Sequence, residues 1–196
     1  MEQNTDKELM KRVIDRDTRA FEVIYCRYEL FIFNFILKYS GNRELAQDLL
    51  QETFTRVWVA AHTFNLMHGN FKGWVLKIAL NLTRNELSRK RYDYHYLDVT
   101  AMNEGQDEIA DSHGELPDHS SEQSDLKHVI GEALGQLSPV LREIIVMKHF
   151  QQLKFKEIAE ITETPEGTLK ARFHRAISQL REILAPSDLN DASIQR

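Results

Sequence analysis

The sequence predicts an all-α fold in which a flexible acidic linker joins two small helical domains. Apolar residues recur every three or four positions in two segments, and neither segment alternates apolar and polar residues as a strand would. Between them, residues 98–125 carry nine acids, no Lys or Arg and no aromatic residue. Such a composition buries too little apolar surface to fold. We therefore expect domains at 1–97 and 126–185, the linker at 98–125 and a polar, frayed tail at 186–196.

Three helices are predicted in the first domain. Apolar residues follow helical spacing from Phe21 to Tyr39, and Ser40-Gly41-Asn42 then breaks the helix and can cap the next. A second helix is expected from about Arg43 to Ala61, with Leu45, Leu49, Val57 and Trp58 buried by their spacing. The loop His62 to Asn70 leads to a third, from Phe71 to about Tyr92.

The second domain starts near Leu126 with a helix that runs to about Leu137. Another helix follows Ser138-Pro139, where Ser caps and Pro takes the first helical position. Phe155 to Thr162 forms the next helix, and after a turn containing Pro165 the last helix spans about Glu166 to Leu184.

The rest of the composition argues against several classes of protein. The single cysteine, Cys26, excludes an internal disulfide, and its place on the apolar side of a helical pattern favours a buried small hydrophobic residue over a redox sensor. The eight His lack metal-ligand spacing, and no nucleotide-binding loop or nucleophile motif is present. We expect no cofactor, no metal site and no catalytic residue, and hence not an enzyme.

The chain is expected to be cytoplasmic, without direct insertion into a membrane. No run approaches the roughly 18 apolar residues of a membrane span. Residues 1–19 alternate charges where a signal peptide needs an apolar stretch.

The segments FKEIAEI, TETP and EGTLKARFHRAISQLREIL, from Phe155 onward, match a helix-turn-helix that places its second helix in a DNA major groove. Ala159 is the small residue where the two helices cross, and Ile158, Ile161 and Leu169 are expected to pack between them. Glu163 stands where Gly is common, which costs about 1 kcal/mol if its backbone is left-handed. An ordinary helix pair with a solvated basic face is the alternative.

A net charge of −5 opposes binding to DNA, but the charge is distributed unevenly along the chain. Residues 1–97 carry 15 Lys/Arg against 12 Asp/Glu, and residues 126–196 carry 10 against nine. The excess of negative charge belongs to the linker.

Five stretches occur in order along the chain: AFEVIYCRY, AQDLLQETFTRVW, FKGWVLKIALNLTRNELSRKR, LSPVLREIIVMKHFQQLKFKEIAEI and PEGTLKARFHRAISQL. In these stretches the chain resembles the extracytoplasmic-function (ECF) sigma factors, which consist of region 2, a linker and region 4. The resemblance covers most of the chain. It implies that 1–97 is region 2, which binds core RNA polymerase and reads and melts the −10 element, and that 126–185 is region 4, which reads the −35 element.

The resemblance gives a role to a polar stripe on the second helix. In the family a D-L-x-Q-E pattern faces the clamp helices of the largest polymerase subunit, and a charged and amide face offers acceptors to Arg on that partner. Without the resemblance, such a stripe would be interpreted as a solvent-exposed helix face. The stripe consists of Asp48, Gln51, Glu52 and Thr55.

The loop His62 to Asn70 and the helix after it resemble the −10 recognition and melting element. Aromatic stacking, amides and cations hold single-stranded DNA, and an Asn matching Asn81 helps to form the family's pocket for a flipped non-template base. Phe71 and Trp74 also fit an apolar helical face, so core packing is the favoured alternative for both. The expected −10 residues are Phe64, Asn65, Trp74, Lys77, Asn81, Arg84, Asn85, Arg89, Lys90 and Arg91.

For the −35 element, the resemblance places one group of side chains in the major groove and another on phosphates. The groove positions are Lys170, Ala171, His174 and Arg175, and the phosphate positions are Thr168 and Arg172. Relatives often carry other residues at the positions of Ala171 and His174, so the resemblance does not predict which promoter sequence this chain reads.

The implied partners are core RNA polymerase, through its clamp helices and flap, promoter DNA and an anti-sigma factor. A linker of about 28 residues spans roughly 30 Å on average, and its acids suit basic polymerase channels, with an inert spacer as the alternative. A conventional regulator that binds DNA without joining polymerase is the competing function. It needs neither the polar stripe nor the Trp74 to Asn85 helix.

Overall fold

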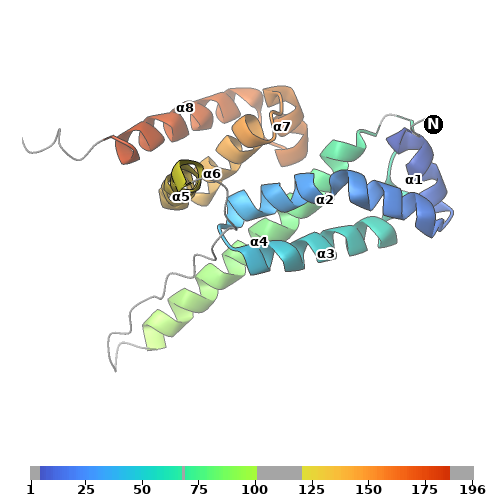
Figure 1. Cartoon of the computed structure of the whole chain (residues 1–196), viewed down its shortest axis with the longest axis horizontal. Helices are drawn as coiled ribbons and strands as arrows, with labels where there is room; N and C mark the ends of the chain where they lie inside the picture. Colours follow the sequence, from blue (N-terminus) through green and yellow to red (C-terminus); the bar gives the residue numbers. More distant parts are fainter. Residues whose placement is uncertain (1–4, 68, 101–120, 186–196) are drawn as a thin grey trace, which may run out of the picture. The chain divides into compact units, whose positions relative to one another are not determined.

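The computed structural model describes the backbone of residues 5–67, 69–100 and 121–185, and side chains over 5–67, 69–89 and 129–185. Within these ranges the regular secondary structure is helical throughout, which confirms the predicted all-α class. The chain divides into two compact units, Met1–Glu115 and Leu116–Arg196 (Figure 1). In the described part of the chain, no helix is long and apolar enough to cross a membrane.

The first unit opens with a helix that the sequence analysis did not predict, α1 (Asp6–Ile14). A capping box begins it: Glu8 N donates to the Thr5 hydroxyl at 3.3 Å, and Thr5 N donates to the Glu8 carboxylate at 2.7 Å. Leu9, Met10 and Val13 bury one face of this helix. The T-x-x-E pattern before an apolar run was the signal that could have revealed it.

Helix α2 (Thr18–Ser40) ends at Gly41, which has a φ of 72°. Asn42 then begins α3 (Arg43–Val59), because its side-chain oxygen accepts a hydrogen bond from Leu45 N at 2.8 Å. The predicted helix break and cap are confirmed. Helix α4 (Phe71–Thr100) follows the loop.

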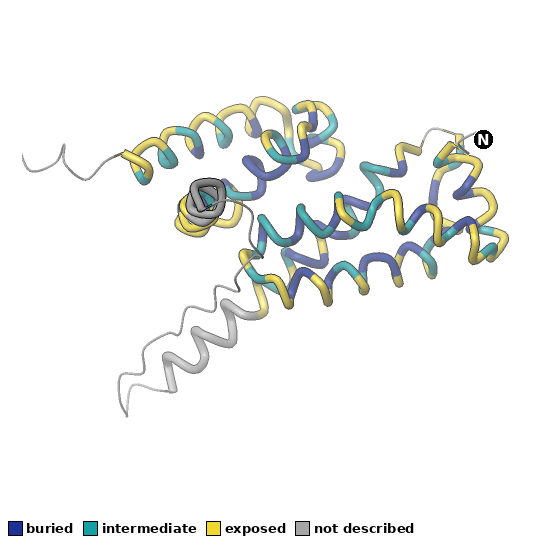
Figure 2. The backbone as a smooth tube through the Cα atoms, in the orientation of Figure 1, coloured by how far each residue is buried: buried dark blue, intermediate teal, exposed yellow. Residues whose placement is uncertain are grey.

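The core of this unit lies where α2 packs against α1, α3 and α4. Buried and exposed positions alternate along these helices with the helical period (Figure 2). Fully buried side chains include Ile24, Ile32, Phe35, Leu76 and Leu80. The resulting scaffold presents the remaining faces of α3 and α4 to solvent.

The expected burial of Cys26 is wrong, since the cysteine is exposed. Ile24, two residues earlier, is fully buried. Two residues turn an α-helix by about 200°, so Cys26 lies on nearly the opposite side of α2. The apolar pattern of α2 is wide enough to include residues that no other helix covers.

The second unit contains α5 (Ser121–Gln136), α6 (Pro139–Ile145), a π-helical turn over Val146–Phe150, α7 (Phe155–Thr162) and α8 (Glu166–Ile183). Pro139 takes the first position of α6 as predicted. Ser138 occupies the N-cap position, but its hydroxyl makes no capping hydrogen bond, which corrects the expected side-chain cap.

The helix-turn-helix packs as predicted. Ile158, Ile161 and Leu169 are buried, and α7 packs on α8. Glu163 ends α7 with φ 54° and ψ 35°, so its backbone is left-handed and the condition for the strain is met.

Both helices beside the predicted linker are longer than expected. Helix α4 continues to Thr100, and no Gly or Pro stands between Tyr92 and Thr100 to end it earlier. Helix α5 begins at Ser121, five residues before the predicted start near Leu126. The rest of the linker, 101–120, and the tail, 186–196, lie outside the described residues.

Candidate functional site

The polar stripe lies on the solvent side of α3. Asp48, Gln51 and Thr55 are exposed. Glu52 is half-buried, and its Oε1 accepts a hydrogen bond from Arg56 Nε at 2.7 Å. The spacing i, i+3, i+4 and i+7 keeps the four side chains on one face, so the stripe offers carboxylate and amide oxygens to a partner.

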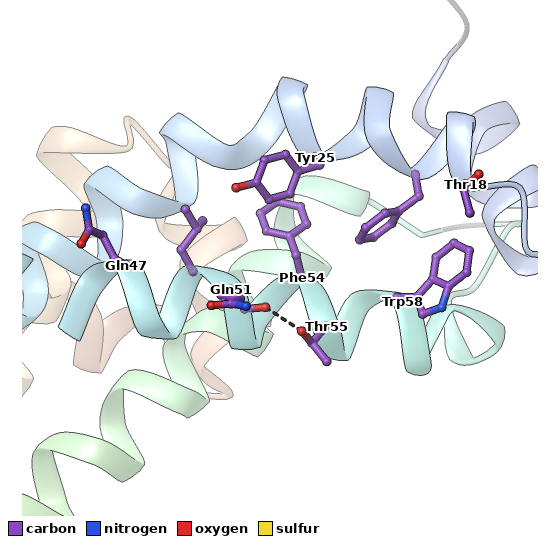
Figure 3. A pocket seen from close by; sticks show the side chains of 9 residues that line it. Thr18, Tyr25, Gln47, Gln51, Phe54, Thr55 and Trp58 are labelled. Atoms are coloured by element: carbon purple, nitrogen blue, oxygen red, sulfur yellow. Dashed lines mark hydrogen bonds between the residues drawn. The ribbon is translucent and has the colours of Figure 1, made fainter. Parts of the chain in front are cut away.

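An open groove between α2 and α3 runs beside this stripe (Figure 3). Its apolar walls include Phe21 and Tyr25 from α2 and Phe54 and Trp58 from α3. The ring centroids of Tyr25 and Phe54 lie 4.7 Å apart. Burial raises the pKa of the Tyr25 hydroxyl, and the nearby Glu29 adds to the rise. The tyrosine therefore stays neutral.

Trp58 was expected to be buried by spacing, but it is half-exposed and lines this groove. The Arg16 guanidinium lies 5.3 Å from the Trp58 ring centroid and donates to the Trp58 carbonyl at 2.8 Å. The arginine thereby links the turn between α1 and α2 to the end of α3. Sequence spacing gives no sign of this groove, because it predicts an apolar face without showing how completely a neighbour covers it.

Three aromatic residues form the base of the loop between α3 and α4. The ring of Phe64 lies 5.9 Å from Phe71 and 5.4 Å from Trp74, measured between centroids. Phe64 is 5% exposed and Phe71 is 2% exposed, whereas Trp74 is half-buried. Core packing is thus confirmed for Phe71. The ring of Phe64 presents no open face on which a base could stack, contrary to the role expected of it.

The loop itself is held by Asn65 and Gly69. The Asn65 side-chain oxygen accepts a hydrogen bond from Met67 N at 2.9 Å, and Gly69 N donates to the Asn65 carbonyl at 2.6 Å. A Cβ on residue 69 would lie 2.2 Å from that carbonyl oxygen, so only glycine fits. Asn65 and Met67 remain exposed.

Most of the other residues predicted to contact the −10 element lie along one side of α4. Asn81 and Asn85, one turn apart, are both exposed, and Lys77 and Arg84 are half-buried. Their spacing from residue 77 brings them to one face. Arg89 is exposed and pairs with Glu86 at 3.0 Å, while the side chains of Lys90 and Arg91 lie outside those described.

The predicted −35 residues lie on the first turns of α8 and face solvent. Exposed are Thr168, Lys170, Ala171, His174 and Arg175, whereas Arg172 is half-buried.

The ring of Phe155, at the start of α7, supports this part of α8. Its centroid lies 5.7 Å from that of Phe173 and 6.0 Å from Lys170 Nζ. Lys148 Nζ lies 5.1 Å from the same ring. One aromatic residue therefore packs against α8 and one of its lysines.

Two family models match the chain in the order of its units. Residues 24–92 match Sigma-70 region 2, and residues 127–180 match Sigma-70, region 4. The first match includes the polar stripe, the loop and the asparagine side of α4. The second includes the helix-turn-helix.

Relatives match along nearly the whole chain. The ECF RNA polymerase sigma factor SigW of Bacillus subtilis is 34% identical over 183 residues, which cover 91% of this chain and 96% of SigW. The RNA polymerase sigma factor CarQ of Myxococcus xanthus is 31% identical over 183 residues, covering 93% and 99%. The sigma factor RpoE of Bartonella quintana, solved in complex with the anti-sigma factor NepR, is 25% identical with a TM-score of 0.65, covering 85% of this chain and 97% of that one. The chain therefore belongs to the extracytoplasmic-function family of RNA polymerase sigma factors.

Proposed function

We propose that this sigma factor binds polymerase through α3 and reads promoter DNA with two separate surfaces, one on each helical unit. The observation that supports this division best is exposure on a packed scaffold. Asp48, Asn81 and His174 face solvent, although the helices that carry them bury their opposite faces.

The polymerase-binding surface is the polar stripe together with the adjoining groove. Asp48 and Gln51 offer acceptors to Arg on the clamp helices, and such charge-assisted hydrogen bonds are stronger than neutral ones. Phe54 and Trp58 in the groove add apolar area next to these polar contacts. The second unit, which matches region 4, would meet the flap.

The −10 surface combines the α3–α4 loop with the exposed side of α4. Asn81 and Asn85 supply amide donors and acceptors for base edges, and Lys77 and Arg84 supply positive charge for the backbone. We assign Phe64 to support of the loop, because its ring is buried against Phe71 and Trp74. The half-exposed Trp74 remains the aromatic residue for stacking.

The −35 surface is the outer side of α8. Lys170, His174 and Arg175 offer groups that reach base edges, and Thr168 and Arg172 contact phosphates. Ala171 leaves room for the groove floor, where an apolar side chain suits a thymine methyl group.

An anti-sigma factor is the third partner that we propose. The Bartonella quintana RpoE was solved with the anti-sigma factor NepR, and this chain covers nearly all of that protein. A linker with nine acids and no base would keep the units separable and suit basic polymerase channels. Because core polymerase and promoter DNA are its proposed partners, we propose that the protein acts in the cytoplasm.

The proposal is tested by transcription in vitro. Core polymerase and genomic DNA from the source organism are incubated with and without the purified chain, and transcript 5′ ends are sequenced. New start sites that share two upstream elements are expected with the chain present. No new start sites, together with DNA binding by the chain alone, would identify a conventional regulator instead.

A further inference from the structure

A hollow in the second unit lies where the α5–α6 turn meets the side of α8. Its apolar lining comes from Val140 and Leu141. Its polar lining consists of two guanidinium groups, two amides and one hydroxyl, and no acidic residue is among the described residues that line it. The polar residues are Gln136, Ser138, Arg172, Arg175 and Gln179.

The chemistry of this lining selects an anion. Both guanidinium groups are permanently charged and donate in a fork that matches a phosphate. The amides and the hydroxyl add neutral donors. A cation would find two positive charges here and no carboxylate.

The position of the hollow on α8 points to the DNA backbone as the source of that anion. Arg172, Arg175 and Gln179 are spaced by three and four residues, so they share one side of the helix. Ala171 and His174 project from the neighbouring side, which we assign to the major groove, and Arg175 lies between the two sides. A phosphate strand borders that groove, so the hollow lies at its edge.

Ser138 is available for such a contact. Its hydroxyl makes no hydrogen bond to the start of α6, although the residue occupies the N-cap position. Arg142 holds the turn instead, donating to the carbonyls of Gly135 at 2.6 Å and Leu137 at 3.2 Å. The turn therefore does not depend on the serine side chain, and the hydroxyl can serve a ligand.

We infer that this hollow binds one backbone phosphate beside the −35 element, with Ser138 and Gln179 donating to it alongside Arg172. The inference rests on the proposed function, since it requires α8 to lie against duplex DNA. It extends the DNA-binding surface beyond the helix-turn-helix to the α5–α6 turn, for which no sequence motif predicted DNA binding.

The test uses holoenzyme assembled from core polymerase and the full chain. Its affinity is measured by fluorescence anisotropy over a series of salt concentrations, for a labelled promoter duplex found by the transcription assay and for the same duplex with a scrambled −35 element. The variants are Ser138→Ala, Arg172→Gln and their combination. Ser138→Thr retains the hydroxyl, and Arg181→Gln removes an exposed charge about 180° around α8 from Arg172.

We expect Ser138→Ala and Arg172→Gln each to weaken binding to both duplexes by about tenfold. For Arg172→Gln, the slope of log K against log salt falls in magnitude by about 1. The double variant should lose less than the product of the single losses, because both residues contact one phosphate. Ser138→Thr and Arg181→Gln should bind like the parent.

Unchanged affinity of Ser138→Ala for DNA would overturn the inference. A double variant whose loss of affinity equals the product of the two single losses would also overturn it. Thermal unfolding of Ser138→Ala is expected to match the parent, so a loss of affinity does not reflect a loss of fold. If the parent holoenzyme fails to distinguish the two duplexes, the proposed −35 function fails. Equal weakening of both duplexes by the hollow variants would still support a phosphate site.

Discussion

The Glu52 carboxylate accepts a hydrogen bond from Arg56 at 2.7 Å, one turn along α3. Glu52 therefore enters any polymerase contact with its charge already paired to a neighbour. Asp48 and Gln51, on the same stripe, are exposed, and no described ion pair holds Asp48. We therefore expect Asp48 and Gln51 to contribute more to polymerase binding than Glu52.

Asp48→Ala and Gln51→Ala should each weaken binding to core polymerase by about tenfold, the effect of one charge-assisted hydrogen bond. Both side chains are exposed, so thermal unfolding should not change. Affinity is measured by competition for core polymerase against a labelled parent chain. Glu22→Ala, an exposed acid on α2, serves as the control. Parent-like affinity in both stripe variants would refute the role of α3.

Gly69→Ala should destabilise the first unit by about 1 to 3 kcal/mol, because its Cβ would overlap the Asn65 carbonyl at 2.2 Å. The matched control is Gly131→Ala in α5, where a Cβ meets nothing within 4 Å. Replacing a helical glycine there should stabilise by about 0.5 to 1 kcal/mol. Thermal unfolding measures both. If both substitutions changed the stability equally and in the same direction, the close approach of residue 69 to the Asn65 carbonyl would be contradicted.

Two left-handed residues should respond in opposite directions to substitution. Glu163 has φ 54°, and Glu163→Gly should raise the free energy of unfolding by up to about 1 kcal/mol through relief of strain. Gly41 has φ 72° with open space around it, so Gly41→Ala should lower that free energy by about 1 kcal/mol. Urea unfolding checks the signs, and a loss of stability in Glu163→Gly would contradict the strain argument.

Arg175→Gln should relax promoter specificity and weaken binding to the preferred −35 sequence by about 1 to 3 kcal/mol. A side chain that reads a base edge discriminates between sequences, whereas one that contacts phosphate weakens all sequences alike. Affinities are compared across duplexes that differ at single −35 positions. An equal loss on every duplex would reassign Arg175 to the backbone.

Asp17 makes the stability of the first unit depend on pH. The Arg12 guanidinium that pairs with it, and the backbone N–H groups that it caps, hold its pKa below the ordinary value. Its stabilising contribution is therefore present above its unfolded pKa of about 3.9 and is lost as pH falls through the lower folded value. Asp17→Asn should unfold at a lower temperature than the parent at pH 7, and the difference should shrink toward pH 2. A constant difference would exclude this linkage.

Helix ends were predictable wherever a side chain or a glycine acts locally. Gly41 and Asn42 end one helix and begin the next through their own backbone and amide, so neighbouring sequence contains the whole cause. The start of α7 at Phe155 was likewise predicted. The capping box of Thr5 and Glu8 is equally local, so neighbouring sequence also contains the cause of the start of α1.

The sequence does not predict which residues of an apolar pattern are exposed, because their exposure depends on which other helices pack against them. Cys26 and Trp58 both fit apolar faces, yet one is exposed and the other lines a groove. Phe64 shows the reverse, since a loop position expected to be open is covered by Phe71 and Trp74. The hollow beside α8 joins residues from two distant segments, and only the fold brings them together.

The chain has two tryptophans, and each lies at a different proposed interface. Trp58 lines the groove beside the polar stripe, and Trp74 packs against the loop that precedes α4. Indole fluorescence responds to changes in its surroundings, so the protein contains one optical reporter for each interface. Trp74→Phe leaves a signal from the α2–α3 groove, and Trp58→Phe leaves a signal from the loop. A clamp-helix peptide and single-stranded promoter DNA can thus be followed separately on an otherwise unlabelled chain.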